Sequence, residues 1–402
     1  MDSVSQITLG AAIGEIVLGR KLGNKAMFWG AVGGTIPDLD IITKPFFTEI
    51  QSLAFHRGIS HSILFAVLFG LGFGWLIHRL YEGQYATSFF RAILSLFISC
   101  IPISIIYFIF GNDWHPNVVA ALAIVVAGVV YTILSRRSDK MVEVVDDNPS
   151  LRSWQWMFFL AFFTHAILDT FTMYGTQLFL PFSNYRAAIA SISVADPLFY
   201  TIPFIICLVV ASRYKKKNTK RRGWAIAGLV LSCTYLLFTL WNKNNVSSVF
   251  ETQMKEQGIT YTRFVTGPTI FNNFLWNMTA DSDDAYYIGQ YSVFDTSPIE
   301  FVRIEKQHDL LANSDNDETI NTLRWFSNDY YSVIRRQDGY LQINDMRYGT
   351  FMGTGEENDF IFRFVVEAQK DGRYEMLKSL GGPDEEDVDD MFGLLFERIG
   401  GR

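Results

Sequence analysis

Long apolar stretches constrain this chain more than any other feature of its sequence. A helix needs about 20 mainly apolar residues to cross about 30 Å of hydrocarbon. Two stretches near the start are less apolar and rich in Gly and Ala, which predicts close helix contacts inside a bundle. We therefore predict a polytopic α-helical transmembrane bundle. The predicted spans are residues 4–19, 25–43, 60–80, 89–110, 117–135, 154–174, 195–212 and 223–241.

The charges divide the chain into two parts. Residues 1–241 contain 19 Lys and Arg and 13 Asp and Glu, whereas residues 242–402 contain 15 and 28. This predicts a transmembrane domain followed by an acidic, soluble α+β domain with an antiparallel sheet. A single soluble domain, a disordered chain and a basic nucleic-acid-binding protein are excluded. The expected strands are 263–265, 285–294, 340–344 and 360–366, and the expected helices are 242–257 and 387–398.

The basic loop 213–222 determines the predicted orientation. It reads RYKKKNTKRR, with seven Lys and Arg in ten residues, and a short loop of this kind stays in the cytoplasm. When the spans are counted outward from it, the basic loops at 136–152 and 20–25 fall on the same side. The C-terminal domain is therefore expected outside the cytoplasm. We expect no cleavable signal peptide, because the first residues lack a basic segment followed by a small-residue cleavage site.

Two polar motifs stand next to apolar spans, where ionisable groups are costly and indicate function. Asp38 and Asp40 end the second span, and in an extended or turn segment they would project the same way and bind a cation. The alternative is a helix-ending turn at the membrane surface. His56 and His61 open the third span and can supply two imidazoles to one metal, with Ser60 as the expected helix N-cap. The alternative is contact with lipid headgroups.

The third motif lies in the sixth span, where His165 and Asp169 are four residues apart and share one helix face. They can offer two ligands, or one ligand and a carboxylate that orients it; the alternative is a His–Asp pair that only packs the bundle. The predicted topology places all three motifs at one membrane face. Imidazoles and carboxylates without a thiolate favour Zn²⁺, Mn²⁺ or a two-metal centre.

Cys100, Cys207 and Cys233 each stand alone in an apolar stretch, which predicts neither a disulfide nor a thiolate site.

Further polar residues are expected at the same face. Arg57 and Arg186 can clamp a phosphate or a carboxylate by bidentate pairing, or anchor the protein to headgroups. Asp196 begins the seventh span before Pro197, so it is either a ligand or an N-cap.

The motifs together resemble a known family. They read DSVSQITLGAAIGEIVLGRKLG, GTIPDLD, FHRGISHS, THAILDTFTMYGTQLFLPFS and VADPLFYTIP, and they are similar to the YdjM-like family of bacterial inner-membrane metal-dependent hydrolases. The resemblance covers residues 1–241 and extends into GPTIFNNFLW and INDMRYGTF. Residues 81–153 depart from the family pattern. The resemblance implies a multi-pass hydrolase of the bacterial cytoplasmic membrane, with a ligand set of Asp38, Asp40, His56, His61, His165 and Asp169.

We therefore expect metal-assisted hydrolysis of a lipid-type or phosphoester substrate at the outer face of the membrane. One or two zinc or manganese ions would activate water. Asp40 or Asp169 would take the proton of that water, and Arg57 or Arg186 would stabilise charge on the leaving group. Membrane lipids are the expected partners, and nucleic acid is not.

Two other functions stay open. A non-enzymatic scaffold would need the soluble domain and would tolerate loss of His56 and His165. A transporter would carry ionisable residues near the middle of several spans and a matching repeat. The polar groups here gather at one face and no repeat is visible, which disfavours the transporter.

Overall fold

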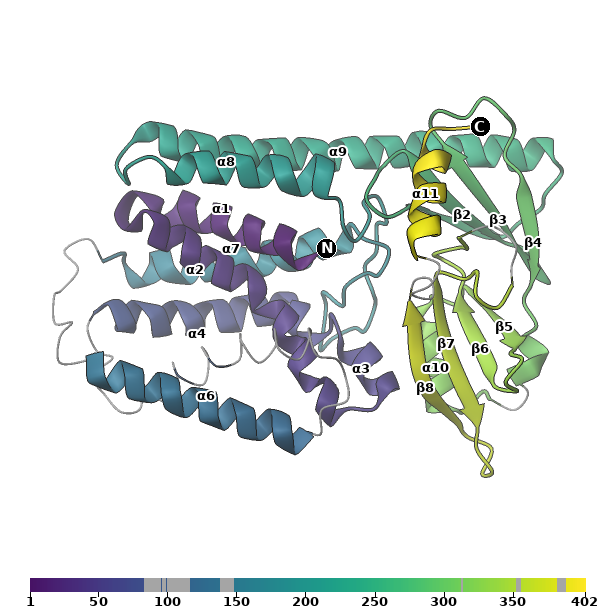
Figure 1. The fold of residues 1–402 in the computed structure, drawn as a ribbon, viewed down its shortest axis with the longest axis horizontal. Helices are drawn as coiled ribbons and strands as arrows, with labels where there is room; N and C mark the ends of the chain where they lie inside the picture. Colours follow the sequence, from purple (N-terminus) through teal and green to yellow (C-terminus); the bar gives the residue numbers. More distant parts are fainter. Residues whose placement is uncertain are drawn as a thin grey trace. The chain divides into compact units, whose positions relative to one another are not determined.

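The computed structural model describes residues 1–82, 95, 99, 116–137, 148–311, 314–351, 356–381 and 388–402 (Figure 1). The chain divides into two compact units. The helical unit contains Met1–Asp169, Thr176–Ala187 and Tyr200–Cys233, and the mixed unit contains Thr170–Gly175, Ala188–Phe199 and Thr234–Arg402. Apart from positions 95 and 99, the predicted span 89–110 lies outside the described residues.

The described part of the helical unit consists mainly of helices. Its helices α1, α4 and α7 lie side by side (Figure 1). The α-helices up to the end of this unit are α1 (Ser3–Leu22), α2 (Asn24–Thr35), α3 (Glu49–Phe55), α4 (Ile63–Tyr81), α6 (Pro116–Arg137), α7 (Leu151–Thr170), α8 (Ile202–Ser212) and the first part of α9 (Thr219–Glu256). The described residues also form two 3-10 helices, η1 (Pro37–Phe46) and η2 (Ile59–His61), and a π-helical turn, η5 (Pro197–Thr201), which begins in the mixed unit.

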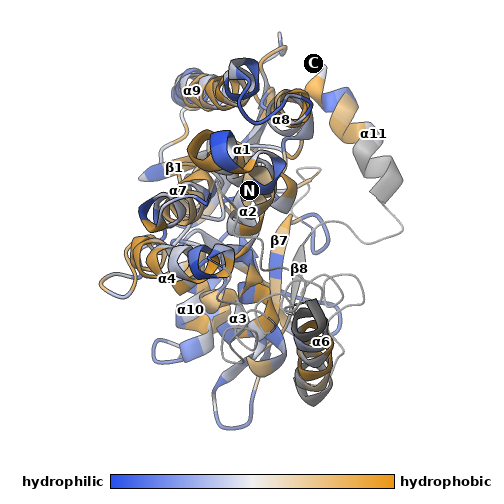
Figure 2. Cartoon of the chain, turned by 90° about the vertical axis from the view of Figure 1, so that its left-hand side faces the viewer, coloured by the Kyte–Doolittle hydropathy of each residue, from blue (hydrophilic) through white to orange (hydrophobic). Residues whose placement is uncertain are grey.

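Two of the described helices are long and apolar enough to cross a membrane, judged by length and composition. They are Ile63–Tyr81 and Thr219–Glu256, and they include most of the predicted spans 60–80 and 223–241. Apolar residues are prominent on α4 (Figure 2). The structure thus has a helical N-terminal part with two candidate spans, and the eight-span topology stays a prediction.

Prolines mark the points at which the helix type changes within two predicted spans. In the predicted span 25–43, α2 ends at Thr35 and a 3-10 helix begins at Pro37. In the predicted span 195–212, a π-helical turn begins at Pro197, and α8 begins only at Ile202. Proline has no backbone N–H to continue the hydrogen-bond pattern of an α-helix, so helices tend to stop or restart there.

Helices α1 and α2 pack backbone against backbone through glycines. A Cβ on Gly30 would lie 2.1 Å from the carbonyl oxygen of Gly10, and one on Gly14 would lie 2.1 Å from that of Ala26. A Cβ on Gly34 would also meet the backbone of α1. Only a residue without a side chain allows this approach. The close helix contact predicted for the two Gly-rich stretches is confirmed.

Helix α7 lies in the core of the helical unit. Its residues Trp154, Phe158 and Phe162 are buried and repeat at helical spacing, so one face of α7 is covered by neighbours. Helix α4 approaches it closely, since a Cβ on Gly70 would lie 2.8 Å from Cα of Phe159. This packing holds the C-terminal end of α7, where His165 and Asp169 lie, in a defined position.

A buried ion pair joins α1 to the start of α9. Arg221 donates to Glu15 through Nε at 2.7 Å and through Nη2 at 2.5 Å, and the two side chains are 2% and 1% exposed. The Nη1 atom of Arg221 donates to Asn24 Oδ1 at 2.7 Å and to the carbonyl of Tyr214 at 3.0 Å. One positive charge of the basic loop 213–222, that of Arg221, is therefore buried inside the protein and not exposed in the loop.

The mixed unit contains two antiparallel sheets, each with its four strands in chain order. The predicted antiparallel sheet is therefore confirmed, and the structure adds a second sheet. All four stretches with predicted strand character contribute to strands, and both predicted helices are present as the end of α9 and as α11. The first sheet is β1 (Arg263–Pro268), β2 (Leu275–Asp281), β3 (Ala285–Ser292) and β4 (Phe301–Glu305); the second is β5 (Tyr331–Arg335), β6 (Leu341–Asp345), β7 (Phe362–Ala368) and β8 (Tyr374–Gly381), with helices α10 (Glu318–Phe326) and α11 (Val388–Ile399).

The C-terminal half of α9 covers the first sheet. Its residues Val246, Phe250 and Met254 are buried against Trp276 and Met278 of β2. Each fully buried apolar side chain of this size contributes about 1.5–3 kcal/mol. This half of α9 is therefore part of the core of the mixed unit.

Candidate metal centre

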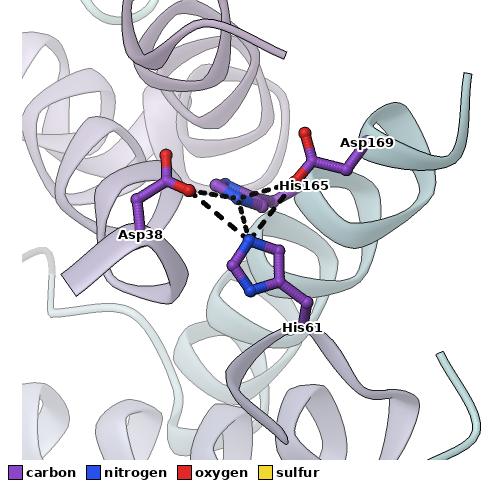
Figure 3. Close-up of side chains that lie close together, drawn as sticks. All are labelled: Asp38, His61, His165 and Asp169. Atoms are coloured by element: carbon purple, nitrogen blue, oxygen red, sulfur yellow. Dashed lines mark hydrogen bonds and ion pairs between the residues drawn. The ribbon is translucent and has the colours of Figure 1, made fainter. Parts of the chain in front are cut away.

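Three segments of the helical unit bring two histidines and two aspartates together (Figure 3). His165 and Asp169 lie on one face of α7, as their spacing predicts, because residues four apart are neighbours on a helix. Asp38 comes from the first turn of η1, and His61 from the end of η2. The two histidines and Asp169 are fully buried, and Asp38 is partly exposed.

The ligand atoms lie within 4.8 Å of one another. The Nε2 atoms of His61 and His165 are 3.1 Å apart. Asp38 Oδ1 lies 3.4 Å from each of them. Asp169 Oδ2 lies 3.2 Å from His61 Nε2 and 3.6 Å from His165 Nε2.

Hydrogen bonds on the far side of each ring determine which nitrogen carries the proton. His165 Nδ1 lies 2.8 Å from the carbonyl oxygen of Gly34, which can only accept. His61 Nδ1 lies 3.0 Å from Ser60 Oγ, whose hydroxyl donates to Asp40 Oδ2 at 3.3 Å. Both Nδ1 atoms therefore donate, and in the neutral rings both Nε2 lone pairs point at each other.

This arrangement fits a bound cation. Two lone pairs 3.1 Å apart repel unless positive charge lies between them, and the two carboxylates supply compensating negative charge. Atoms that coordinate zinc at 2.0–2.1 Å in a tetrahedron are separated by about 3.3 Å, close to the distances in this group. Histidine ligands also characteristically donate their second N–H to a carbonyl or a carboxylate-linked group. The group can therefore hold a metal ion.

Asp40 holds the loop beside the group of four. Its Oδ1 lies 3.1 Å from His56 Nδ1, and its Oδ2 accepts from the backbone N–H of Arg57 at 3.0 Å. The hydroxyl of Ser60 also donates to Oδ2. Asp40 and His56 thus form a neighbouring pair, whereas Asp38 and His61 belong to the group itself.

Two local expectations were wrong. Asp38 and Asp40 do not project the same way, because η1 is a 3-10 helix in which each residue turns the chain by about 120°. The N-cap of α4 is Ser62, whose hydroxyl accepts from the N–H of Phe65 at 3.0 Å. The 3-10 turn η2 carries Ser60 away from the helix start, and its hydroxyl orients His61 instead.

The remaining predicted site residues have different surroundings. Arg57 is buried with Nε 3.3 Å from Asp169 Oδ2, so its positive charge adjoins a ligand. Arg186 is buried beside Ala187, which forms an antiparallel bridge with Thr176. Asp196 accepts from Tyr235 Oη at 2.5 Å and from the N–H of Phe199 at 3.2 Å. These contacts match the N-cap alternative for Asp196.

Three residues of the centre, Gln6, Met1 and Gly34, were not found from the sequence. Gln6 of α1 donates to Asp169 Oδ1 at 2.9 Å and to the carbonyl of His165 at 3.2 Å. The α-amino group of Met1 also contacts Asp169 Oδ1. A signal existed for Gln6, since a polar residue in an apolar helix is costly unless it has a partner. The Gly34 carbonyl gave no signal, because every residue has one.

A comparison with family models supports the relationship suggested by the motifs. The model described as YdjM inner membrane protein matches residues 1–110 and 115–246. No curated protein and no solved structure matches the chain. The family match includes all four residues of the group and covers more than half of the sequence. It also includes most of residues 81–153, so the expectation that this stretch departs from the family pattern was wrong. The chain belongs to the family of YdjM inner membrane proteins.

Proposed function

We propose that this protein is a metal-dependent hydrolase of the bacterial cytoplasmic membrane. One divalent cation, zinc or manganese, is held by Asp38, His61, His165 and Asp169. The observation that carries the proposal is the pair of Nε2 atoms 3.1 Å apart, each with its Nδ1 proton engaged elsewhere. A His–Asp pair that only packs a bundle does not need two imidazole lone pairs to converge with two carboxylates.

The chain's own residues divide the remaining tasks. A bound cation supplies Lewis-acid catalysis and acidifies water. His56 is 34% exposed and held by Asp40, and its ring centroid lies 6.4 Å from that of His61; it would move a proton between the water and the leaving group. Arg57 stabilises negative charge that develops beside Asp169. Water adds across a phosphoester bond, and the leaving alcohol takes the proton.

The proposal includes a multi-pass topology with the centre at the outer face. It is supported by the basic loop 213–222, by the two candidate spans and by the family's description as an inner membrane protein. In this orientation the C-terminal domain lies outside the cytoplasm. The substrate is lipid-type or a phosphoester, and Arg186 is a second cation for its anionic group.

The metal content of the purified full-length protein tests the proposal. We expect about one zinc or manganese per chain in the wild type and loss of this metal in His165→Ala, because the variant removes one of four ligands. His78→Ala is the matched control. His78 pairs with Glu82 near the end of α4 at 3.1 Å and lies outside the group, so its metal content should equal that of the wild type. Hydrolysis of p-nitrophenyl phosphate should follow the metal content.

Two outcomes contradict the proposal. The metal centre is wrong if the wild type carries no stoichiometric metal, or if His165→Ala retains it. The hydrolase is wrong if the metal is present but neither p-nitrophenyl phosphate nor a phospholipid is hydrolysed. In that second case a scaffold role for the acidic domain becomes the better explanation.

Asp40→Asn should weaken metal binding without removing a ligand. The change replaces a charged acceptor of Ser60 and of the Arg57 N–H by an amide, so His61 loses its orientation. The loss of such outer partners costs about 10–100-fold in metal affinity or activity. Titration against a competing chelator measures it. Glu49→Gln, a change of the same chemistry at an exposed site in α3, should leave the affinity unchanged; equal affinities of the two variants would contradict the role of Asp40.

A further inference from the structure

Exposed apolar side chains lie in the segments around the metal group. Five of them, which are listed at the end of this paragraph, form what we call the apolar rim. The most exposed of the five, Phe182, has 87% of its surface accessible. Soluble surfaces rarely gather such side chains unless they bind something. The apolar rim consists of Phe46, Phe47, Ile59, Phe179 and Phe182.

The rim residues belong to the same short segments as the ligands. Phe46 ends η1, the helix that carries Asp38, and Phe47 follows it. Ile59 begins η2, two residues before His61. The backbone positions of these apolar side chains are therefore determined by the elements that build the centre.

Hydrogen bonds attach the segment with Phe179 and Phe182 to this layer. The N–H of Ile63 donates to the carbonyl of Leu178 at 2.9 Å, and the N–H of Gln177 donates to the carbonyl of Arg57 at 3.1 Å. All five rim residues therefore belong to one layer of turns that also holds His61 and Arg57.

This layer directly precedes a candidate membrane span. Helix α4 begins at Ile63, and its residues Leu68, Phe69 and Leu71 are exposed. If α4 crosses the bilayer, its first turn lies at the lipid–water boundary, and the turns that precede it lie at the same level. Exposed aromatic and aliphatic side chains are favourable there, because their surface leaves water.

We propose that the apolar rim is immersed in the outer leaflet, and that the substrate is a lipid phosphoester whose acyl chains stay in the bilayer during hydrolysis. This inference rests on the proposed hydrolase function and names its substrate class. The rim holds the acyl part of the lipid beside the ligands, and the charge of Arg57 attracts the anionic headgroup. Water is added to phosphorus, the P–O bond to the leaving alcohol breaks, and the alcohol takes the proton.

Spin labels test the position of the rim without any activity assay. In full-length protein with Cys100, Cys207 and Cys233 replaced by Ser, a nitroxide is attached after Phe182→Cys or, as control, after Asp284→Cys, which is 76% exposed in the C-terminal domain. The protein is reconstituted into phosphatidylcholine and phosphatidylglycerol vesicles. We expect oxygen to relax the label at 182 more strongly than a water-soluble nickel chelate, and the reverse at 284. Equal exposure of both labels to the nickel chelate overturns immersion.

Kinetics test the substrate class. The double variant Phe179→Ser/Phe182→Ser changes exposed side chains and should keep its metal. We expect at least a tenfold loss of hydrolysis of dioleoyl phosphatidic acid in vesicles, with the rate on p-nitrophenyl phosphate unchanged. Equal rates on the lipid overturn the inference while the hydrolase stands. If the wild type binds metal but hydrolyses neither compound, the proposed function and the substrate class both fail, and the spin labels still report whether the rim is immersed.

Discussion

A Gly30→Ala variant is expected to melt roughly 6–12 °C below the wild type, which corresponds to about 3 kcal/mol in the free energy of unfolding. The added methyl group would lie 2.1 Å from the carbonyl oxygen of Gly10. A backbone atom cannot rotate away as a side chain does, so α1 and α2 must separate. Their separation also moves Gly34 and Gln6, which bind the histidine and the aspartate of α7. Thermal unfolding in detergent, followed by tryptophan fluorescence, measures the effect.

Gly72→Ala is the matched control for this change. It adds the same methyl group to α4 at a position with open space around it. Since alanine is the better helix former by about 1 kcal/mol, the melting temperature should stay the same or rise. If Gly30→Ala melts together with Gly72→Ala, the close packing of α1 on α2 is not what holds this unit together.

A Glu15→Gln variant is expected to lose about 3–5 kcal/mol of stability. The change leaves the guanidinium of Arg221 buried without its carboxylate. Removing one partner of a buried pair costs much more stability than removing one partner of an exposed pair. Glu305→Gln is the control, because Glu305 forms a pair with Arg303 that is exposed on both sides. Such exposed pairs are worth about 0–1 kcal/mol. The melting temperatures of the purified variants give the comparison.

A double variant separates charge from packing. In Glu15→Leu/Arg221→Leu both charges are absent, and apolar replacement of a buried pair is often neutral. We expect the double variant to recover most of the stability that Glu15→Gln loses. A double variant as unstable as the single one would mean that the contacts of Arg221 with Asn24 and Tyr214 dominate instead.

The helices and strands could be predicted where the local pattern is strong. The apolar run that became α4 and the alternating stretch that became β3 were found within a few residues, because periodicity and length report burial directly. The pattern failed at Pro37 and Pro197, where the hydropathy continues but the backbone changes its helix type. Hydropathy averaged over a window does not detect a single missing N–H group.

The sequence was sufficient to identify most residues of the candidate site, but not to say what each of them contacts. His165 and Asp169 share a face because one helix holds them, and a spacing of four is enough to show it. The directions of the Asp38 and Asp40 side chains could be predicted only by knowing that η1 is a 3-10 helix. That helix type depends on tertiary packing and not on local propensity. Glu15 is a charged residue within an otherwise apolar stretch, but its partner Arg221 is 206 residues away. No spacing rule connects residues so far apart.

The strand order of the mixed unit has a consequence for how this part of the protein folds. Every described strand pair joins neighbours in the sequence, from β1–β2 to β3–β4 and again from β5–β6 to β7–β8. Five of the six connections between these paired strands have eight residues or fewer, so little chain entropy is lost before these pairs form. The first sheet can therefore assemble on α9 before the second has been synthesised. A domain with this connectivity can fold stepwise during synthesis, because each strand pairs with a strand next to it in the sequence.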